Sequence, residues 1–190
     1  MIKQKFFQDY HKEFVKTLKL DDEILQKLVF ATELIVNNNK KKGTVYLLGN
    51  GGSNAITSHT AIDFTKNAKI KASSFTDGSI ITCLSNDFGH DNWMAKALEI
   101  YCANSDLIIF ISSSGNSKNI VNAAKYCVEN NIRHISFTGM EKANSLNKIC
   151  DRKTNFWVDS FSYNMIEMAH QFYLLAIVDK IIGKTVYKAS

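Results

Sequence analysis

Serine hydroxyls and one glycine follow directly after a short apolar run in the middle of the chain. The run is Leu107-Ile108-Ile109-Phe110-Ile111, and the segment after it is Ser112-Ser113-Ser114-Gly115-Asn116-Ser117. Five consecutive apolar residues predict a strand buried on both faces, and residues 118–128 have helical spacing. Hydroxyls and unpaired backbone N–H groups at the start of a helix can bind an anion such as a phosphate group. Taken alone, the segment also fits a serine-rich helix cap without a ligand.

A second turn of the same design lies near residue 50. A predicted strand at 44–48 is followed by Gly49-Asn50-Gly51-Gly52-Ser53, and apolar residues at helical spacing come next. Three glycines allow the backbone to bend sharply and to approach a ligand closely. The segment is neither a dinucleotide-binding fingerprint nor a P-loop, because the G-x-G-x-x-G and G-K-[ST] patterns are missing. We therefore expect no nucleotide cofactor.

Alternating strands and helices are predicted to position both turns. The expected strands cover 44–48, 71–76, 107–111, 133–138 and 154–158. With helical segments between them, these strands predict an α/β fold: a five-stranded parallel sheet between two layers of helices. Ligands of such sheets bind beyond the carboxyl ends of the strands, which is where both turns fall.

Further helices are predicted at the two ends of the chain. Apolar residues have helical spacing over 1–38, and Leu20-Asp21-Asp22-Glu23 marks the start of a second helix there. The last helix, Tyr163 to Ile182, is apolar nearly all round, which favours burial at a subunit interface. No repeat or flexible linker divides the sequence. We expect one domain over 1–190, with a helical extension at 1–38 and a core at 44–182.

The composition excludes several classes of protein. The chain has 190 residues, 45% of them hydrophobic, and a formal net charge of +5. No apolar run approaches the roughly 18–20 residues that span a membrane, and we expect no signal peptide. Four cysteines lie far apart without a C-x-x-C pair, which favours a cytoplasmic protein with reduced thiols. The positive charge is scattered, so we expect neither nucleic acid nor a membrane as a partner.

The two turns, with Ser85-Asn86-Asp87-Phe88-Gly89 between them, resemble the sugar isomerase (SIS) domain family, and within it the phosphoheptose isomerase branch. The resemblance covers essentially the whole chain. It implies a flavodoxin-like three-layer αβα sandwich and a homotetramer with active sites at subunit interfaces. It also implies a phosphorylated heptose as substrate, isomerised for lipopolysaccharide or capsule synthesis.

The resemblance further implies a set of substrate-binding residues. These are small residues of the two turns and one aspartate: Asn50, Gly51, Gly52, Ser53, Asp87, Ser112, Ser113, Ser114 and Ser117. Ser112, Ser114 and Ser117 are expected to hold the sugar phosphate, while Asn50, Ser53 and Asp87 meet the sugar hydroxyls. Without the resemblance, Asp87 in an Asn-Asp-Phe-Gly turn would be an ordinary capping residue.

Isomerisation of an aldose to a ketose through an enediol requires a base that moves a proton between neighbouring carbons. The resemblance assigns this role to Asp63, which lies four residues after His59 and hence on the same face of a helix. The family has glutamate at this position, and aspartate is one methylene shorter. The family also places a glutamine and a later histidine on the last helix. Here Glu167 replaces the glutamine, and the histidine position falls at or near Leu175.

His170 is the histidine that remains on the last helix, three residues after Glu167. With His59 and Asp63, these two would form a set of two histidines and two carboxylates suited to Zn²⁺, and His170 and Glu167 would join Asp63 in catalysis. Alternatively, His170 is a packed interface residue and the metal site is lost. Two function classes therefore stay open: an isomerase, and a non-catalytic SIS protein that binds a sugar phosphate and has a regulatory or scaffolding role.

Overall fold

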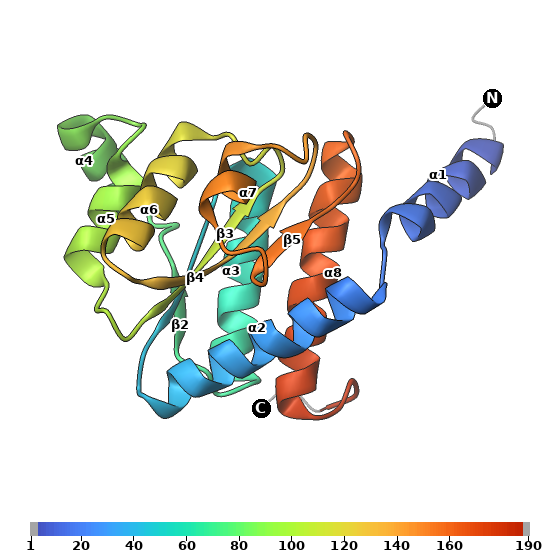
Figure 1. The fold of residues 1–190 in the computed structure, drawn as a ribbon, viewed down its shortest axis with the longest axis horizontal. Coiled ribbons are helices and arrows are strands. Elements are labelled where there is room, and N and C mark those ends of the chain that lie inside the picture. The colour runs from blue at the N-terminus through green and yellow to red at the C-terminus, as the bar shows by residue number, and fades with distance from the viewer. Residues whose placement is uncertain (1–3, 188–190) are drawn as a thin grey trace.

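A parallel sheet of five strands forms the centre of the computed structural model, which describes residues 4–187 (Figure 1). Its strands follow the order β2-β1-β3-β4-β5, and all neighbours are parallel. The strands are β1 Val45–Gly49, β2 Ala72–Ser74, β3 Leu107–Ser112, β4 Arg133–Thr138 and β5 Asn155–Trp157. All five lie where the sequence predicts them, with ends that differ by no more than a few residues. The predicted fold class is confirmed.

The central strand β3 is apolar from Leu107 to Ile111 because both of its faces are covered. Leu107, Ile109 and Ile111 belong to the core on one face of the sheet, whereas Ile108 and Phe110 belong to the core on the other. Every residue of β3 is buried. A strand that is covered on both faces needs apolar side chains at consecutive positions, because successive side chains point to opposite faces.

Helices cover both faces of the sheet and produce the predicted three layers (Figure 1). One face is covered by α2 Asp22–Lys40, α3 Gly51–Lys66 and α8 Tyr163–Ile182. The other is covered by α4 Gly78–Phe88, α5 Trp93–Tyr101, α6 Lys118–Glu129 and α7 Ser145–Ile149. None of the helices over residues 4–187 is long and apolar enough to cross a membrane.

The N-terminal helix α1, Gln4–Thr17, extends away from the body of the molecule (Figure 1). It has no buried residue, and Phe6, Phe7 and Val15 are each more than half exposed. The predicted helical extension is therefore made of α1 and α2, but only α2 packs on the sheet. The last helix α8 is less buried than its sequence suggests, because Phe172 is 40% exposed.

The segment from Ser85 to Gly89 differs from its predicted form. We expected a turn around Asp87, but Ser85–Phe88 is the last turn of helix α4, and Gly89 with φ 79° ends it. The helix begins with Asp77, whose carboxylate accepts hydrogen bonds from the amides of Ser79 and Ile80. A capped start and apolar residues at helical spacing extend the helix over the whole segment.

Candidate active site

The serine-rich segment forms a tight loop between β3 and α6. Gly115, at φ 64°, has the left-handed backbone that the turn needs, and its amide donates to the carbonyl and hydroxyl oxygens of Ser112. The Ser114 hydroxyl accepts a hydrogen bond from the amide of Asn116 at 3.2 Å. Each of these hydroxyls keeps its own hydrogen free to donate to a further acceptor, such as a phosphate oxygen.

Two more serines of this loop have unused hydrogen-bonding capacity. The Ser113 hydroxyl is buried without a partner among the described residues. Ser117 is the N-cap of α6, but its side chain makes no capping hydrogen bond. The positive end of the α6 dipole is therefore left for an external anion. These features are those expected of a phosphate site.

A second loop, which contains Asn144 and Ser145, contacts the serine-rich segment and holds it in place. The Asn116 side-chain oxygen accepts hydrogen bonds from both the amide and the hydroxyl of Ser145, at 2.9 and 2.8 Å. A side chain on Gly115 would overlap the amide group of Asn144, so only glycine fits at this position. The loop is thus fixed in shape before any ligand arrives, which lowers the entropic cost of binding.

The glycine-rich turn lies beside the serine-rich loop, and a pair of asparagines joins them. The Asn50 amide nitrogen donates to the Asn119 side-chain oxygen at 3.0 Å, and Asn119 donates back to Asn50 at 3.0 Å. The same Asn119 oxygen accepts from the amide of Ile120. The beginnings of α3 and α6 are therefore tied together. Asn119 was not predicted from the sequence, and its partner is 69 residues away.

A cavity of about 450 Å³ opens next to the glycine-rich turn, between α1, α3 and α8. Three predicted site residues line it: Gly52, His59 and Glu167. The Glu167 carboxylate lies so close to Gly52 that any side chain at that position would overlap it. Burial raises the pKa of Glu167 above its usual range. A carboxyl group with a raised pKa beside a ligand site is suited to proton transfer.

His59 and Asp63 interact on α3, as their spacing predicts. His59 Nε2 lies 3.2 Å from Asp63 Oδ2, and Asp63 Oδ1 accepts a hydrogen bond from Asn67 at 2.9 Å. Gln171 of α8 places its amide nitrogen 2.9 Å from His59 Nδ1. If Gln171 donates to Nδ1, the ring hydrogen lies on Nε2 and donates to Asp63. Gln171 has no counterpart in the sequence prediction, since only packing of α8 on α3 brings it there.

His170 points away from this cavity and into the core. It is fully buried, its Nε2 is 3.0 Å from the carbonyl oxygen of Thr138, and its ring packs edge-on against Phe137. Nδ1 is buried without a partner among the described residues. Burial lowers the pKa of His170 to about 4, although the bond to Thr138 opposes this change. His170 is therefore a neutral residue that supports the end of β4.

The predicted zinc set does not come together within one chain. Over residues 4–187 there is no group of three or more His, Cys, Asp or Glu side chains arranged to hold a metal ion. His59 and Asp63 are in contact, but His170 faces the sheet, because this part of α8 packs against the end of β4. The residues of one subunit thus do not fit the ion, and zinc binding stays a prediction that needs further ligands from another subunit.

Among the described residues, the Asp87 side chain makes no hydrogen bond with either of the two turns. It is exposed near the end of α4, where its carboxylate accepts from Asn86 at 3.0 Å and contacts the Cys83 thiol at 3.8 Å. Ser53 is buried at the start of α3. Contact of either residue with a sugar stays a prediction.

Comparison with known proteins agrees with this architecture. The family profile described as the SIS domain matches residues 7–139, which is more than two thirds of the chain. The chain belongs to the SIS domain family. Its relatives within this family include phosphoheptose isomerase 2 of Campylobacter jejuni, 36% identical over 146 residues that cover 72% of this chain and 71% of the relative. The phosphoheptose isomerase of Aliarcobacter butzleri is 31% identical over 153 residues, or 77% and 79% of the two chains.

A solved structure extends the likeness to the whole SIS fold. The phosphoheptose isomerase of Neisseria gonorrhoeae superposes with a TM-score of 0.83 at 25% identity, over 94% of this chain and 97% of that one. This match continues beyond residue 139, where the family profile ends. The resemblance to the phosphoheptose isomerase branch, predicted from three short motifs, is confirmed.

Proposed function

We propose that this SIS protein is an aldose–ketose isomerase of a phosphorylated sugar, with sedoheptulose 7-phosphate as the substrate and a heptose 7-phosphate as the product. The relatives named phosphoheptose isomerase support the choice of sugar. We further propose that the reaction takes place in the cytoplasm and supplies heptose for lipopolysaccharide or capsule.

The unpaired donors of the serine-rich loop are the observation that carries this proposal. Ser112, Ser114 and Ser117 belong to one short loop at the start of α6 and offer neutral hydroxyl donors. Such a loop can bind a dianion through hydrogen bonds and the helix dipole. The Asn50–Asn119 pair ties the glycine-rich turn, where we propose that the sugar binds, to the start of α6.

We propose that Glu167 takes part in proton transfer. Its carboxylate contacts Gly52, in the turn where the sugar is proposed to bind. Asp63 lies eleven residues further along α3, about 16 Å away at 1.5 Å per residue. A sugar held at the two turns of one subunit is therefore beyond the reach of Asp63 of that subunit. We propose that Asp63 acts on a substrate whose phosphate is bound by a neighbouring subunit.

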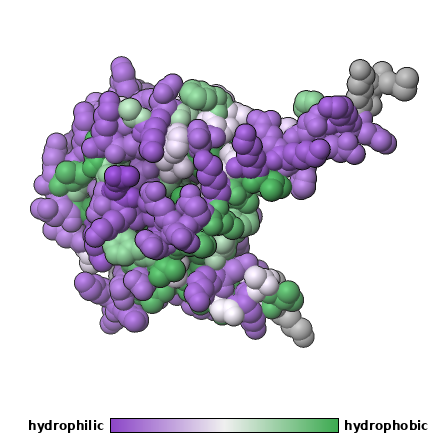
Figure 2. Space-filling model, turned by 45° about the vertical axis from the view of Figure 1, so that its right-hand side comes forward, coloured by the Kyte–Doolittle hydropathy of each residue, from purple (hydrophilic) through white to green (hydrophobic). Residues whose placement is uncertain are grey.

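Exposed apolar surface supports such an assembly. Helix α1 has no buried residue, and α2 exposes Leu25, Val29 and Phe30. Apolar residues also gather on the body next to the point where α1 leaves it (Figure 2). A monomer would leave this surface in water, so we propose a homotetramer in which these helices pack between subunits.

The chemistry follows from these groups. A carboxylate takes a proton from C1 of the ketose, the electrons of the C–H bond form the enediol, and the proton returns to C2 to give the aldose. Protons on the two oxygen atoms must be exchanged as well, and we propose that the His59 ring, whose Nε2 contacts Asp63, takes part in this exchange.

The direct test is turnover of sedoheptulose 7-phosphate by the purified protein, with and without added Zn²⁺, together with metal analysis. We expect turnover, and we expect the Ser114→Ala/Ser117→Ala variant to lose turnover and the binding that the serine-rich loop provides, measured by calorimetry, while it stays folded. Wild-type protein that binds the sugar phosphate without converting it would contradict the isomerase assignment.

The same result would favour the alternative, a sugar-phosphate-binding SIS protein with a regulatory or scaffolding role. Two observations favour that alternative. Asp63 is shorter than the glutamate expected at its position and is already engaged by His59 and Asn67. In addition, Leu175 lies near the position where the resemblance places a histidine. The phosphate loop fits both functions, so turnover decides between them.

A further inference from the structure

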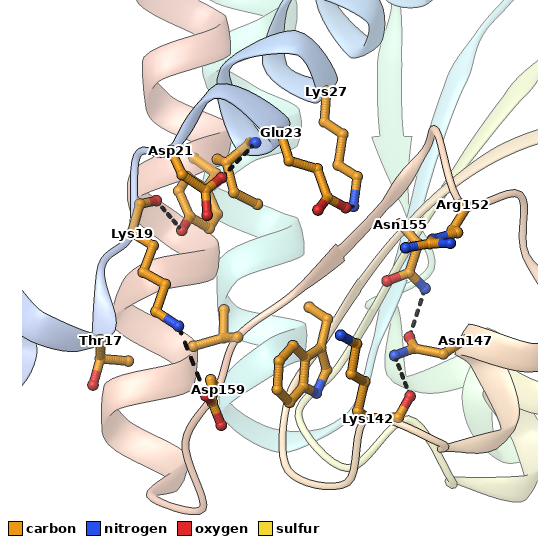
Figure 3. A pocket seen from close by; sticks show the side chains of 14 residues that line it. Thr17, Lys19, Asp21, Glu23, Lys27, Lys142, Asn147, Arg152, Asn155 and Asp159 are labelled. Carbon is orange, nitrogen blue, oxygen red and sulfur yellow. Dashed lines mark hydrogen bonds and ion pairs between the residues drawn. The ribbon is translucent and has the colours of Figure 1, made fainter.

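A second polar cavity, of about 330 Å³, lies on the side of the molecule where β5 forms the edge of the sheet (Figure 3). Its walls are formed by the α1–α2 junction, by the start of α2, and by residues in and around α7 and β5. The volume falls in the lower part of the range of pockets that bind small molecules. The cavity shares no residue with the predicted substrate-binding, catalytic or metal set.

Two cations on its wall make no ion pair with the described residues, although both lie near enough to Glu23 to help lower the pKa of that carboxyl group. Arg152 makes no hydrogen bond or ion pair with any residue of 4–187, and Lys142 Nζ contacts only the ring of Trp157, at 5.4 Å from its centre. The other two cations are paired: Lys27 with Glu23 at 2.8 Å, and Lys19 with Asp159 at 3.7 Å. The cavity therefore has two positive charges available for an anion.

The same wall contains a buried acceptor that faces the cavity. Asn155, 5% exposed, donates from its amide nitrogen to Ser136 Oγ at 3.0 Å and to Asn147 Oδ1 at 2.6 Å. Its own oxygen accepts no hydrogen bond from the described residues, and in Figure 3 it points into the space between the sheet and α2. This oxygen opens to the cavity, where it can accept a hydrogen bond from a sugar hydroxyl in place of water.

The cavity is built from ordered groups rather than from mobile surface side chains. Thr138 Oγ1 donates to Asn147 Oδ1 at 2.7 Å, and the Asn147 amide donates to the carbonyl of Lys142 at 2.8 Å. On the opposite wall, the Tyr173 hydroxyl donates to the carbonyl of Lys19 at 2.9 Å and fixes the chain before α2. Both walls are therefore in place before a ligand binds.

We propose that this cavity is a second binding site for an anionic sugar, with the phosphate or carboxylate on Arg152 and Lys142 and a hydroxyl on Asn155. Two free cations alone would suit inorganic phosphate. The Asn155 oxygen and the carboxylate of Asp21 add acceptors for hydroxyl donors, of which a sugar phosphate presents more than inorganic phosphate does. The inference is independent of catalysis at the first site.

The test uses the full-length Ser114→Ala/Ser117→Ala protein, in which the proposed phosphate loop is disabled. Sedoheptulose 7-phosphate is titrated while tryptophan emission is recorded. Trp157 lines the cavity, whereas Trp93 is buried in the helix layer on the far face of the sheet. We expect a saturable change in emission, and a Kd at least tenfold weaker when Arg152→Met and Lys142→Met are added.

Matched controls separate this site from other binding. Lys153→Met removes the same charge next to Arg152 but outside the cavity, and it should leave Kd unchanged. Trp157→Phe should remove the emission signal while calorimetry still detects binding. The proposal fails if the loop variant shows no saturable binding, if the Arg152/Lys142 variant binds as before, or if inorganic phosphate binds as tightly as the sugar phosphate. Absence of turnover by the wild-type protein would contradict only the proposed isomerase and would leave binding at this cavity unaffected.

Discussion

At the scale of single residues, the carboxylates of the proposed site differ in their surroundings. Glu167 is partly buried beside Gly52, while Asp63 is held by His59 and Asn67 on a more distant turn of α3. Both can move protons only if the sugar lies within hydrogen-bonding distance. Their roles can therefore be separated by substitutions that retain size and remove charge.

Asp63→Asn should reduce kcat by about two orders of magnitude or more, with KM nearly unchanged, because the amide cannot accept the carbon-bound proton. The side chain keeps its hydrogen-bonding oxygen, so the fold should remain intact. Steady-state kinetics with sedoheptulose 7-phosphate measures this. An Asp77→Asn variant, which changes a helix cap remote from the cavity, is the control and should keep its kcat. Equal turnover of Asp63→Asn and wild type would remove Asp63 from the mechanism.

His170 should make the protein sensitive to acid. Burial lowers its folded pKa to about 4 from the usual 6.5, so the unfolded chain takes up the proton first. The stability that depends on neutral His170 is complete above pH 6.5 and is lost as the pH falls toward 4, on the order of 3 kcal/mol in total.

Urea unfolding at pH 7 and pH 4.5, at constant protein concentration, measures this loss. His170→Gln retains a donor for the Thr138 carbonyl but does not titrate, so its stability should fall less between the two pH values. The same loss in both proteins would show that other groups cause the acid sensitivity.

At the scale of elements, the proposed function depends on two strand–turn–helix units that keep a fixed position relative to each other. The Asn50–Asn119 pair is the direct bond between them, and both side chains use their donors and acceptors on each other. Because Asn119 is 2% exposed, water cannot reach its amide group to replace a hydrogen-bonding partner that has been lost.

Asn119→Ala should weaken sugar-phosphate binding about tenfold by calorimetry, because the starts of α3 and α6 are no longer fixed relative to each other. The expected loss is in affinity and KM, with a smaller effect on kcat. Asn130→Ala, at the exposed end of the same helix, is the matched control and should bind normally. A loss of thermal stability with unchanged affinity would assign Asn119 a structural role alone.

At the scale of the whole molecule, the proposal requires residues of two subunits to complete each site. Light scattering at micromolar concentration should give the mass of a tetramer, since α1 has no buried residue in the single subunit. A variant with Phe6→Ser and Phe7→Ser should dissociate or lose activity, because both side chains are more than 60% exposed and need a partner surface. Monomeric wild-type protein would contradict both the assembly and the shared active site.

Mixed tetramers test the sharing directly. Asp63→Asn and Ser114→Ala/Ser117→Ala subunits should each be inactive alone. Refolded or exchanged together, they should regain part of the activity, because some sites then combine an intact serine loop with an intact Asp63. No recovery would place both groups in the same subunit's site.

The sequence by itself determined the strands and the turns that carry the chemistry. Leu107–Ile111 is apolar at consecutive positions, and this pattern is set by burial on both faces of a sheet. Gly51 and Gly115 have positive φ angles that other residues rarely adopt, so both turns could be located from glycine alone. Local requirements of this kind depend on residues that are neighbours in the sequence.

Only the tertiary structure decided which side chains meet. Asn119 pairs with Asn50 across 69 residues, and Gln171 reaches His59 across 112. His170 and Glu167 are three residues apart, yet His170 faces the core and Glu167 lines a cavity. The reason is that α8 packs between β4 and α3, so neighbouring positions on its inner side meet different elements. Helical spacing fixes the direction of a side chain relative to its own helix. What lies in that direction depends on elements distant in the sequence.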